Sequence, residues 1–123
     1  VDDDILVRDA LALGLTDAGY EVLTAPGAAA GLDLVKRQAF DALVTDINMP
    51  GTDGVQLISQ ARAAFPNLPI IAISGATEVE GRSLGDAAVH LGASASLVKP
   101  FRARQLAEVL DRLLADRRAS SGG

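Results

Sequence analysis

The stretch DALVTDINMPGTDG, residues 41–54, indicates the fold of this chain more strongly than any other part of the sequence. Ala42, Leu43 and Val44 form a short unbroken apolar run, which is typical of a strand buried on both faces of a parallel sheet. The run ends at Asp46, and the proline and glycines that follow cannot continue a strand. The stretch therefore predicts a buried strand with an acidic side chain at its carboxyl end, where an open α/β sheet presents its reactive groups.

Short apolar runs alternate with helical patterns on both sides of this stretch, which predicts βα units around one parallel sheet. We expect strands at residues 20–25, 70–74 and 96–98, helices at 27–38, 55–65 and 78–91, and a last amphipathic helix carrying Leu106, Val109, Leu110, Leu113 and Leu114. Asp4 is a candidate cap for a first helix that Gly19 ends. The organisation expected is one domain over residues 1–116, with residues 117–123 as a disordered polar tail or the start of a linker.

The first strand of this pattern is represented by Val1 alone. In a five-stranded sheet of this kind the first strand is an interior one, so its loss would leave buried backbone groups without partners. Two interpretations stay open: residues upstream of Val1 complete the strand, or another segment fills the gap.

The composition is acidic, free of cysteine and poor in aromatic residues. At 123 residues the chain has room for one core, which Leu, Val, Ile and Ala must fill because only 3% of residues are aromatic. The net charge of -5 argues against direct binding to nucleic acid. The absence of cysteine excludes disulfides, thiolate chemistry and cysteine-ligated zinc. We find no membrane-spanning run or signal peptide pattern, so we expect a soluble cytoplasmic protein with no membrane contact.

Polar residues also stand at the ends of the other predicted strands. They are Asp2 and Asp3 after the first strand, Ser74 at the end of residues 70–74, and Lys99 after residues 96–98. Because the carboxyl ends of parallel strands share one edge, we expect these groups to converge on Asp46. The set matches what phosphoryl transfer needs: a carboxylate nucleophile, a cation that balances charge, and fixed donors for the phosphate oxygens.

The acidic residues divide into a nucleophile and metal ligands. We predict that an oxygen of Asp46 attacks phosphorus and forms an acyl phosphate. Asp3 and Asp46 would supply carboxylates to Mg²⁺, Asp2 would hold a metal-bound water, and the backbone carbonyl of Asn48 would be a further ligand. Without a cation, acids this close would raise one another's pKa.

Three residues are candidates for holding the phosphoryl group itself. Lys99 would place a positive charge beside one phosphate oxygen. Ser74 would donate its hydroxyl to another oxygen, and Gly75 leaves room for the group. Pro50 and Gly54 are assigned to the turn that follows the central strand.

Four motifs, VDDD, TDINMPGTDG, ISGA and VKPF in this order, resemble the response regulator receiver family of two-component signalling over about residues 1–114. The resemblance implies an α/β, flavodoxin-like, doubly wound five-stranded parallel sheet of order 2-1-3-4-5, whose first strand is truncated in this chain. It implies that Asp46 is the phospho-accepting residue and that Asp2 and Asp3 serve Mg²⁺. It also makes Ser74 the switch hydroxyl and Lys99 the conserved type of lysine.

Two further positions are interpreted through this resemblance. Pro100 matches the proline that follows a cis bond in the family, at a sharp strand-to-helix turn. Ser96 stands where the family often has an aromatic switch residue, so coupling through a swinging ring is not expected here.

The function expected is that of a magnesium-dependent phosphoprotein, a receiver domain that takes a phosphoryl group from a sensor histidine kinase or phosphotransfer protein. Phosphorylation would reshape the face formed by the fourth helix, fifth strand and fifth helix, and so change contact with an output protein or domain. A homodimer is left open. The domain would catalyse only its own phosphorylation and dephosphorylation, so it is not classed as an enzyme.

Two alternatives remain. One is a receiver-like interaction module that never signals through phosphate. The other is a hydrolase with an aspartyl nucleophile, which is disfavoured because Asn48 occupies the position, two residues past Asp46, where a general acid would stand.

Overall fold

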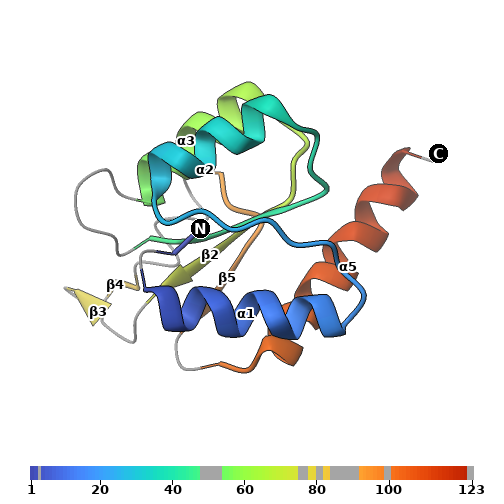
Figure 1. Ribbon diagram of the computed structural model, residues 1–123. Helices are drawn as coiled ribbons and strands as arrows, with labels where there is room; N and C mark the ends of the chain where they lie inside the picture. Colours follow the sequence, from blue (N-terminus) through green and yellow to red (C-terminus); the bar gives the residue numbers. More distant parts are fainter. Residues whose placement is uncertain are drawn as a thin grey trace.

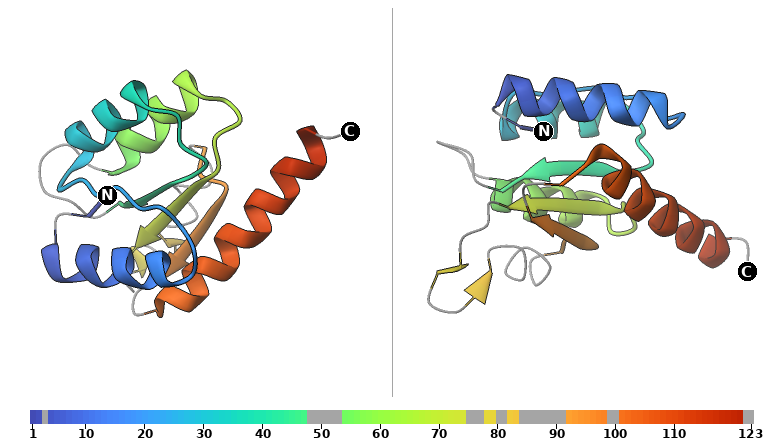
Figure 2. Two further views of the ribbon diagram at one scale, coloured as in Figure 1. Left: turned by 45° about the vertical axis from the view of Figure 1, so that its right-hand side comes forward. Right: turned by 90° about the horizontal axis from the view of Figure 1, so that it is seen from below.

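The computed structural model describes residues 1–2, 4–47, 54–74, 78–79, 82–83, 92–98 and 101–121. Its centre is a parallel sheet of order β1-β2-β5, built from β1 (Leu43–Asp46), β2 (Ile70–Ser74) and β5 (Ala95–Val98). Helices α2 (Ala28–Arg37) and α3 (Gly54–Ala64) lie on one side of the sheet, while α1 (Ile5–Asp17) and α5 (Ala103–Ser121) lie on the other (Figure 1). Figure 2 shows the same layers from two further directions.

The two sides of the sheet have separate hydrophobic clusters, and β2 contributes to both. Ile70 and Ala72 pack with the side chains of α2 and α3, whereas Ile71 packs with those of α1 and α5. Successive side chains of a strand point to opposite faces, so one apolar run fills both clusters. All five residues of β2 are buried, as predicted for a strand covered on both faces.

The ends of α1 are set by local chemistry. The Asp4 carboxylate accepts hydrogen bonds from the backbone N–H groups of Leu6 at 3.0 Å and Val7 at 3.4 Å, which confirms its predicted role as N-cap. After the helix, Gly19 has a φ of 99°, a left-handed conformation that glycine adopts without strain. The chain can therefore turn sharply there, as the sequence predicted.

Several predicted elements are confirmed with small shifts in their ends. The strand expected at residues 70–74 matches β2, and the helices expected at 27–38 and 55–65 match α2 and α3 to within one residue at each end. The helix α5 continues to Ser121, so residues 117–121, expected to be a disordered tail or the start of a linker, are helical. Alanine and arginine, which make up much of that stretch, have high intrinsic helix propensity.

The strand predicted at residues 20–25 is wrong, because these residues have irregular structure. Their alternating pattern fits a strand, but a strand also needs a hydrogen-bonded neighbour, and the neighbouring position holds little more than Val1. Val1 donates to the carbonyl oxygen of Val44 at 2.6 Å, and its own carbonyl oxygen accepts from the N–H of Asp46 at 2.8 Å. The N–H of Asp2 donates to the carbonyl oxygen of Ala25 at 3.2 Å. Val1 and Asp2 thus lie between β1 and Ala25, which is the place of the first strand in the order 2-1-3.

The helix predicted at residues 78–91 is also wrong in its first part. The two short strands β3 (Glu78–Val79) and β4 (Arg82–Ser83) pair in antiparallel fashion. Residues 80–81 and 84–91 lie outside the described part of the chain. Two residues separate these strands in the sequence, and one of them is Gly81. Glycine in a two-residue connection favours a hairpin, and it disfavours a helix by about 1 kcal/mol relative to alanine.

Candidate functional site

Two polar side chains lie at the carboxyl ends of neighbouring strands. Asp46 ends β1 and is 3% exposed, and Ser74 ends β2 and is 1% exposed. The parallel register pairs Asp46 with Ile73, so Ser74 is one residue beyond the partner of Asp46. The predicted nucleophile and the predicted switch hydroxyl therefore share one edge of the sheet.

Asp2 is brought to this edge by the hydrogen bonds of Val1. The carbonyl of Val1 is bonded to the N–H of Asp46, so the next residue, Asp2, lies beside the end of β1. Asp2 is 3% exposed, and its Oδ1 accepts from the N–H of Asp4 at 2.9 Å. The structure thus gathers Asp2, Asp46 and Ser74, which the sequence analysis placed together from strand order alone.

The electrostatics around Val1 reflect this arrangement. Burial lowers the pKa of the Val1 amino group from 8.0 to about 6, and the nearby carboxylates of Asp2 and Asp46 oppose part of that change. The Arg8 guanidinium lowers the pKa further by charge repulsion. Both carboxylates therefore lie close enough to act on the same amino group.

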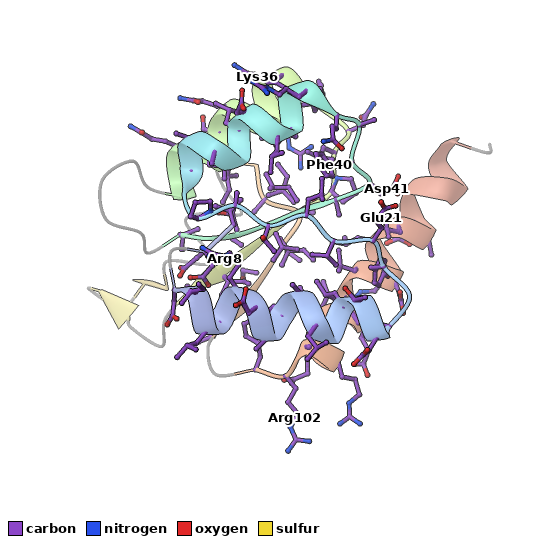
Figure 3. All side chains as sticks on the ribbon, in the orientation of Figure 1. Arg8, Glu21, Lys36, Phe40, Asp41 and Arg102 are labelled. Atoms are coloured by element: carbon purple, nitrogen blue, oxygen red, sulfur yellow. The ribbon has the colours of Figure 1, made fainter. Side chains whose placement is uncertain are left out.

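Arg8 is a residue of this neighbourhood that the sequence analysis missed. It lies at the end of the first turn of α1, and its Nη1 donates to the carbonyl oxygen of Asp2 at 3.1 Å. Figure 3 shows the Arg8 side chain at the start of α1, on the side that faces the sheet. The signal was present in the sequence: Arg8 follows the cap residue Asp4 by four positions, which places it one turn above the acidic segment.

Ser74 has an unusual environment for a buried hydroxyl. Within the described residues, its Oγ is buried and has no hydrogen-bond partner. Burying a hydroxyl without a partner costs about 1–3 kcal/mol, so such a group calls for an explanation. A ligand oxygen at the edge of the sheet would supply the missing partner.

The donor set is compatible with a magnesium ion, although part of it lies outside the described residues. Asp2 and Asp46 are two buried carboxylates on adjacent segments, and Mg²⁺ in proteins takes one or two carboxylates together with waters and phosphate oxygens. Among the residues that the structure describes, no group of three acidic, histidine or cysteine side chains gathers at one point. The remaining predicted ligands, Asp3 and Asn48, are not among those residues.

Some of the other predicted site residues are described by the structure and some are not. Gly54, assigned from the sequence to the turn after the central strand, is the first residue of α3. Ser74 pairs with Val98 in the register of β2 and β5, so Lys99 follows the residue opposite Ser74 in the sequence. Gly75, Lys99, Pro50 and Pro100 themselves lie outside the described residues, and their roles stay predictions.

A known protein family has this fold and this arrangement of acidic residues. The model of the response regulator receiver domain matches residues 1–111, so the chain belongs to the response regulator receiver domain family of two-component systems. Among the helices in the described part, none combines the length and apolar character that a membrane crossing requires.

Similar proteins agree with this assignment. The chain is 38% identical to the response regulator protein FleR of Pseudomonas aeruginosa over 91% of this chain and 23% of that protein. It is 39% identical to the transcriptional regulatory protein PrrA of Mycobacterium tuberculosis over 94% of this chain and 47% of that protein. The chain thus spans slightly under a quarter of the first of these curated relatives and slightly under half of the second.

Solved structures show the same fold. A CheY-like receiver domain protein from Methanospirillum hungatei superposes with a TM-score of 0.87 at 28% identity, covering 97% of this chain and 93% of that one. The receiver domain of NtrX from Brucella abortus superposes with a TM-score of 0.84 at 33% identity, covering 93% and 94% of the two chains. The flavodoxin-like α/β fold expected from the sequence is confirmed by these matches.

Proposed function

We propose that this chain is a phospho-accepting receiver domain in which Asp46 takes a phosphoryl group from a histidine kinase or phosphotransfer protein. The observation that carries the proposal is the edge formed by Asp46, Asp2 and Ser74, whose buried hydroxyl has no hydrogen-bond partner among the described residues, in a chain of the receiver family. Two buried carboxylates and a hydroxyl donor at the ends of parallel strands are groups that phosphoryl transfer to a carboxylate requires.

The reaction is a substitution at phosphorus. A carboxylate oxygen of Asp46 attacks the phosphorus of a phosphohistidine, a P–O bond forms as the P–N bond breaks, and the histidine nitrogen leaves with the bonding pair. The main chain holds Asp46 rigidly for this attack, since its N–H is bonded to Val1 and its carbonyl oxygen accepts from the buried Thr45 hydroxyl at 3.0 Å. A fixed nucleophile loses little entropy on reaching the geometry of attack.

The residues of the edge would also manage charge. Bound Mg²⁺ would neutralise part of the charge on the transferring phosphoryl oxygens. Asp2 and Asp46, with Asp3 and Asn48, are the residues that would hold it. Arg8 fixes the main chain of Asp2 through its bond to the Asp2 carbonyl oxygen, and this keeps the Asp2 carboxylate at the edge.

Ser74 is the residue that would report the modification. Its Oγ lies at the end of β2 without a partner in the described structure, and a phosphoryl oxygen on Asp46 is an acceptor that it would reach by a small movement. Phosphorylation adds about -1.5 to -2 charges at neutral pH, which draws hydroxyl and cationic donors inward. Ser74 and Lys99 would then pull on the ends of β2 and β5 and alter a partner-binding face.

The partners follow from the family and are part of the proposal. A sensor kinase or phosphotransfer protein would act as donor, and an output domain or protein would read the altered face. PrrA is a transcriptional regulatory protein of about twice this length, so attachment to an output domain fits that relative. The domain would act only on itself, in the cytoplasm, without a separate substrate pool.

Phosphorylation with a small-molecule donor tests the proposal. The chain is incubated with acetyl phosphate and MgCl₂, and intact mass is measured with and without a chelator. We expect a gain of one phosphoryl mass that requires Mg²⁺ and is lost in Asp46→Asn. The matched control is Asp41→Asn, because Asp41 stands exposed just before the same strand and should leave the mass gain intact.

Other outcomes would redirect the assignment. Equal mass gain in Asp46→Asn would place the modification elsewhere. No gain at any magnesium concentration, in a chain shown to be folded by circular dichroism, would favour a phosphate-independent interaction module. Sustained hydrolysis of an external phosphate ester would instead indicate a hydrolase.

A further inference from the structure

Arg8 is a basic residue at the end of a helix where positive charge is unfavourable. It is the fourth residue of α1, which begins at Ile5. The amino end of a helix carries a partial positive charge, and the first turn of α1 contains no acidic residue that would offset a cation there. The Arg8 side chain is also half-buried, and burying a charge is costly unless opposite charges lie near it. The position of Arg8 therefore calls for acidic groups nearby.

Hydrogen bonds join Arg8 and the acidic segment into one unit. The Oδ1 of Asp2 accepts from the N–H of Asp4 at 2.9 Å. The Asp4 carboxylate in turn accepts from the N–H groups of Leu6 and Val7. Arg8 closes the unit, because its Nη1 donates to the carbonyl oxygen of Asp2 at 3.1 Å. Asp2 is thus attached to the first turn of α1 through its side chain and through its main chain, and the guanidinium has a fixed place beside it.

The guanidinium lies within electrostatic range of the two buried carboxylates. Standard bond lengths place the carboxylate of Asp2 within about 5 Å of its own carbonyl oxygen, and hence within about 8 Å of Arg8 Nη1. Arg8, Asp2 and Asp46 also all influence the pKa of the Val1 amino group, so the three charges lie near one atom. Charges about 8 Å apart still interact in about 0.1 M salt, where the Debye length is about 10 Å. Because the hydrogen bond of Arg8 goes to a carbonyl oxygen, its charge acts on the carboxylates through space.

We propose that Arg8 is the counter-cation of the acidic edge and a positioning residue for its magnesium site. Its charge offsets part of the repulsion between the carboxylates of Asp2 and Asp46, and its bond to the Asp2 carbonyl oxygen keeps the acidic segment on α1. The role of Arg8 rests on the proposed function, because the site concerned is the one that would hold Mg²⁺ for phosphoryl transfer.

The charge of Arg8 has the opposite effect on a bound metal ion. A guanidinium about 8 Å from the ligand carboxylates repels a divalent cation that those carboxylates hold. At this separation the repulsion changes a dissociation constant by about threefold to tenfold in low salt. Arg8 therefore stabilises the metal-free edge, and it raises the concentration of Mg²⁺ at which the edge is loaded.

A purely structural role for Arg8 predicts a different result. If Arg8 only tied Asp2 to α1, its loss would loosen a metal ligand, and both the fold and the binding of Mg²⁺ would become weaker. Loss of a counter-cation instead weakens the metal-free fold and strengthens the binding of Mg²⁺. Stability and metal affinity therefore change in opposite directions in one case and in the same direction in the other.

Four variants test the proposal. Arg8→Met removes the charge and keeps an apolar stem of similar length. Arg8→Gln removes the charge and keeps an N–H donor, so it stays informative even where Arg8→Met unfolds. Arg8→Lys keeps the charge, and the matched control Arg112→Met removes the same charge from an exposed position on α5.

Two quantities are measured for each variant and for the parent chain. The thermal midpoint is measured without Mg²⁺. The dissociation constant for Mg²⁺ is measured from the amide shift of Asp46, at low salt and in about 1 M KCl, where the Debye length falls to about 3 Å.

We expect Arg8→Met to melt about 3 °C or more below the parent chain without metal, and to bind Mg²⁺ about threefold or more tightly at low salt. Arg8→Gln should show the same gain in affinity. In about 1 M KCl both should come within about twofold of the parent dissociation constant, because the charge of Arg8 is then screened. Arg8→Lys and Arg112→Met should stay within about twofold of the parent at either salt concentration.

Affinity for Mg²⁺ that is equal or weaker in the neutral variants at low salt would overturn the proposal. A gain in affinity that persists unchanged in about 1 M KCl would overturn it as well, because the cause would then not be charge.

The proposed function is tested separately by the mass gain of the parent chain with acetyl phosphate. A parent chain that is phosphorylated, with no gain in Mg²⁺ affinity in the neutral variants, refutes the role of Arg8 alone. A parent chain that binds no Mg²⁺ and gains no mass refutes both the role of Arg8 and the proposed function.

Discussion

The two edges of β1 differ in how much of their backbone is hydrogen-bonded. On one edge all four residues of β1 pair in register with β2, from Leu43 with Ile70 to Asp46 with Ile73. On the other edge Val1 provides the bonds near the carboxyl end, and a cavity of about 510 Å³ lies beyond it. The side chains of β1 are common to both edges, so the difference comes from the backbone partner. An apolar pattern predicts where a strand can form. Whether a segment such as residues 20–25 becomes a strand also depends on a neighbouring strand with which its backbone can pair.

The comparison matters for function because the site takes residues from both edges. Asp46 and Ser74 lie on the fully paired side, where their positions follow from the ladder of β1 and β2. Asp2 lies on the open side and is positioned by a few hydrogen bonds. Asp46, the proposed nucleophile, is therefore held more firmly than Asp2.

The largest difference is expected from truncating a side chain on each side. Ile71 is completely buried in β2, and Ile71→Ala should lower the free energy of unfolding by about 2–5 kcal/mol. Val22 is partly buried beside the cavity, and Val22→Ala should cost about 1 kcal/mol or less. Urea unfolding of both variants measures the difference. Equal losses would mean that the open side is packed as tightly as the paired side.

The pH dependence of stability reports on the open side. The pKa of the Val1 amino group is about 6 in the folded chain and 8.0 ordinarily, so the unfolded chain binds more protons between these values. Stability should therefore rise from pH 6 to pH 8, by up to roughly 2–3 kcal/mol, and the penalty should be constant below pH 6. Urea unfolding of the free and the N-terminally acetylated chain isolates this effect, because the contribution of His90 is common to both. Parallel pH profiles would show that Val1 is not buried.

The paired side has a brace that can be removed. The Arg62 guanidinium donates to the carbonyl oxygens of Gly92 at 2.9 Å and Pro66 at 2.7 Å, and thereby ties the end of α3 to the start of β5. Arg62→Ala should cost about 1–3 kcal/mol in urea unfolding. The control is Arg37→Ala, which removes an exposed ion pair with Asp33 and should cost about 0.5 kcal/mol or less. A similar loss in the free energy of unfolding for both variants would show that Arg62 does not stabilise the link between α3 and β5.

The smallest effect is expected at the cap of α1. Asp4→Ala removes the acceptor for the N–H groups of Leu6 and Val7 and should lower stability by about 0.5–2 kcal/mol. Asp9→Ala, an exposed change in the same helix, should stay within about 0.5 kcal/mol of the parent chain. Thermal or urea unfolding distinguishes the two, and a larger cost for Asp9→Ala would contradict the capping assignment.

How much the sequence predicts depends on whether the cause is local. The apolar run that fills β2 up to Ser74 and the cap at Asp4 are local signals, and both were predicted at the correct residues. Residues 20–25 and 78–83 were wrong for two different reasons. Residues 20–25 need a neighbouring strand that no local pattern reveals. At residues 78–79 and 82–83 two short strands pair where the sequence has only a weak helical pattern.

The candidate site shows the same division. Strand order alone was sufficient to bring Asp46, Ser74 and Asp2 to one edge, because carboxyl ends of parallel strands coincide. The contact of Arg8 with the Asp2 carbonyl oxygen depends on how α1 packs after its first turn, and this was not predicted. That Ser74 Oγ has no hydrogen-bond partner among the described residues is likewise a property of packing, which the sequence does not reveal.

The most direct test of the account is a magnesium titration followed by backbone amide NMR, with beryllofluoride added at the end. The account predicts that Mg²⁺ shifts the amides of Asp2 and Asp46 first, and that beryllofluoride then shifts the amide of Ser74. Both responses should be absent in Asp46→Asn. Shifts confined to exposed acids such as Asp9, Asp17 and Asp33, with Asp2, Asp46 and Ser74 unmoved, would contradict it.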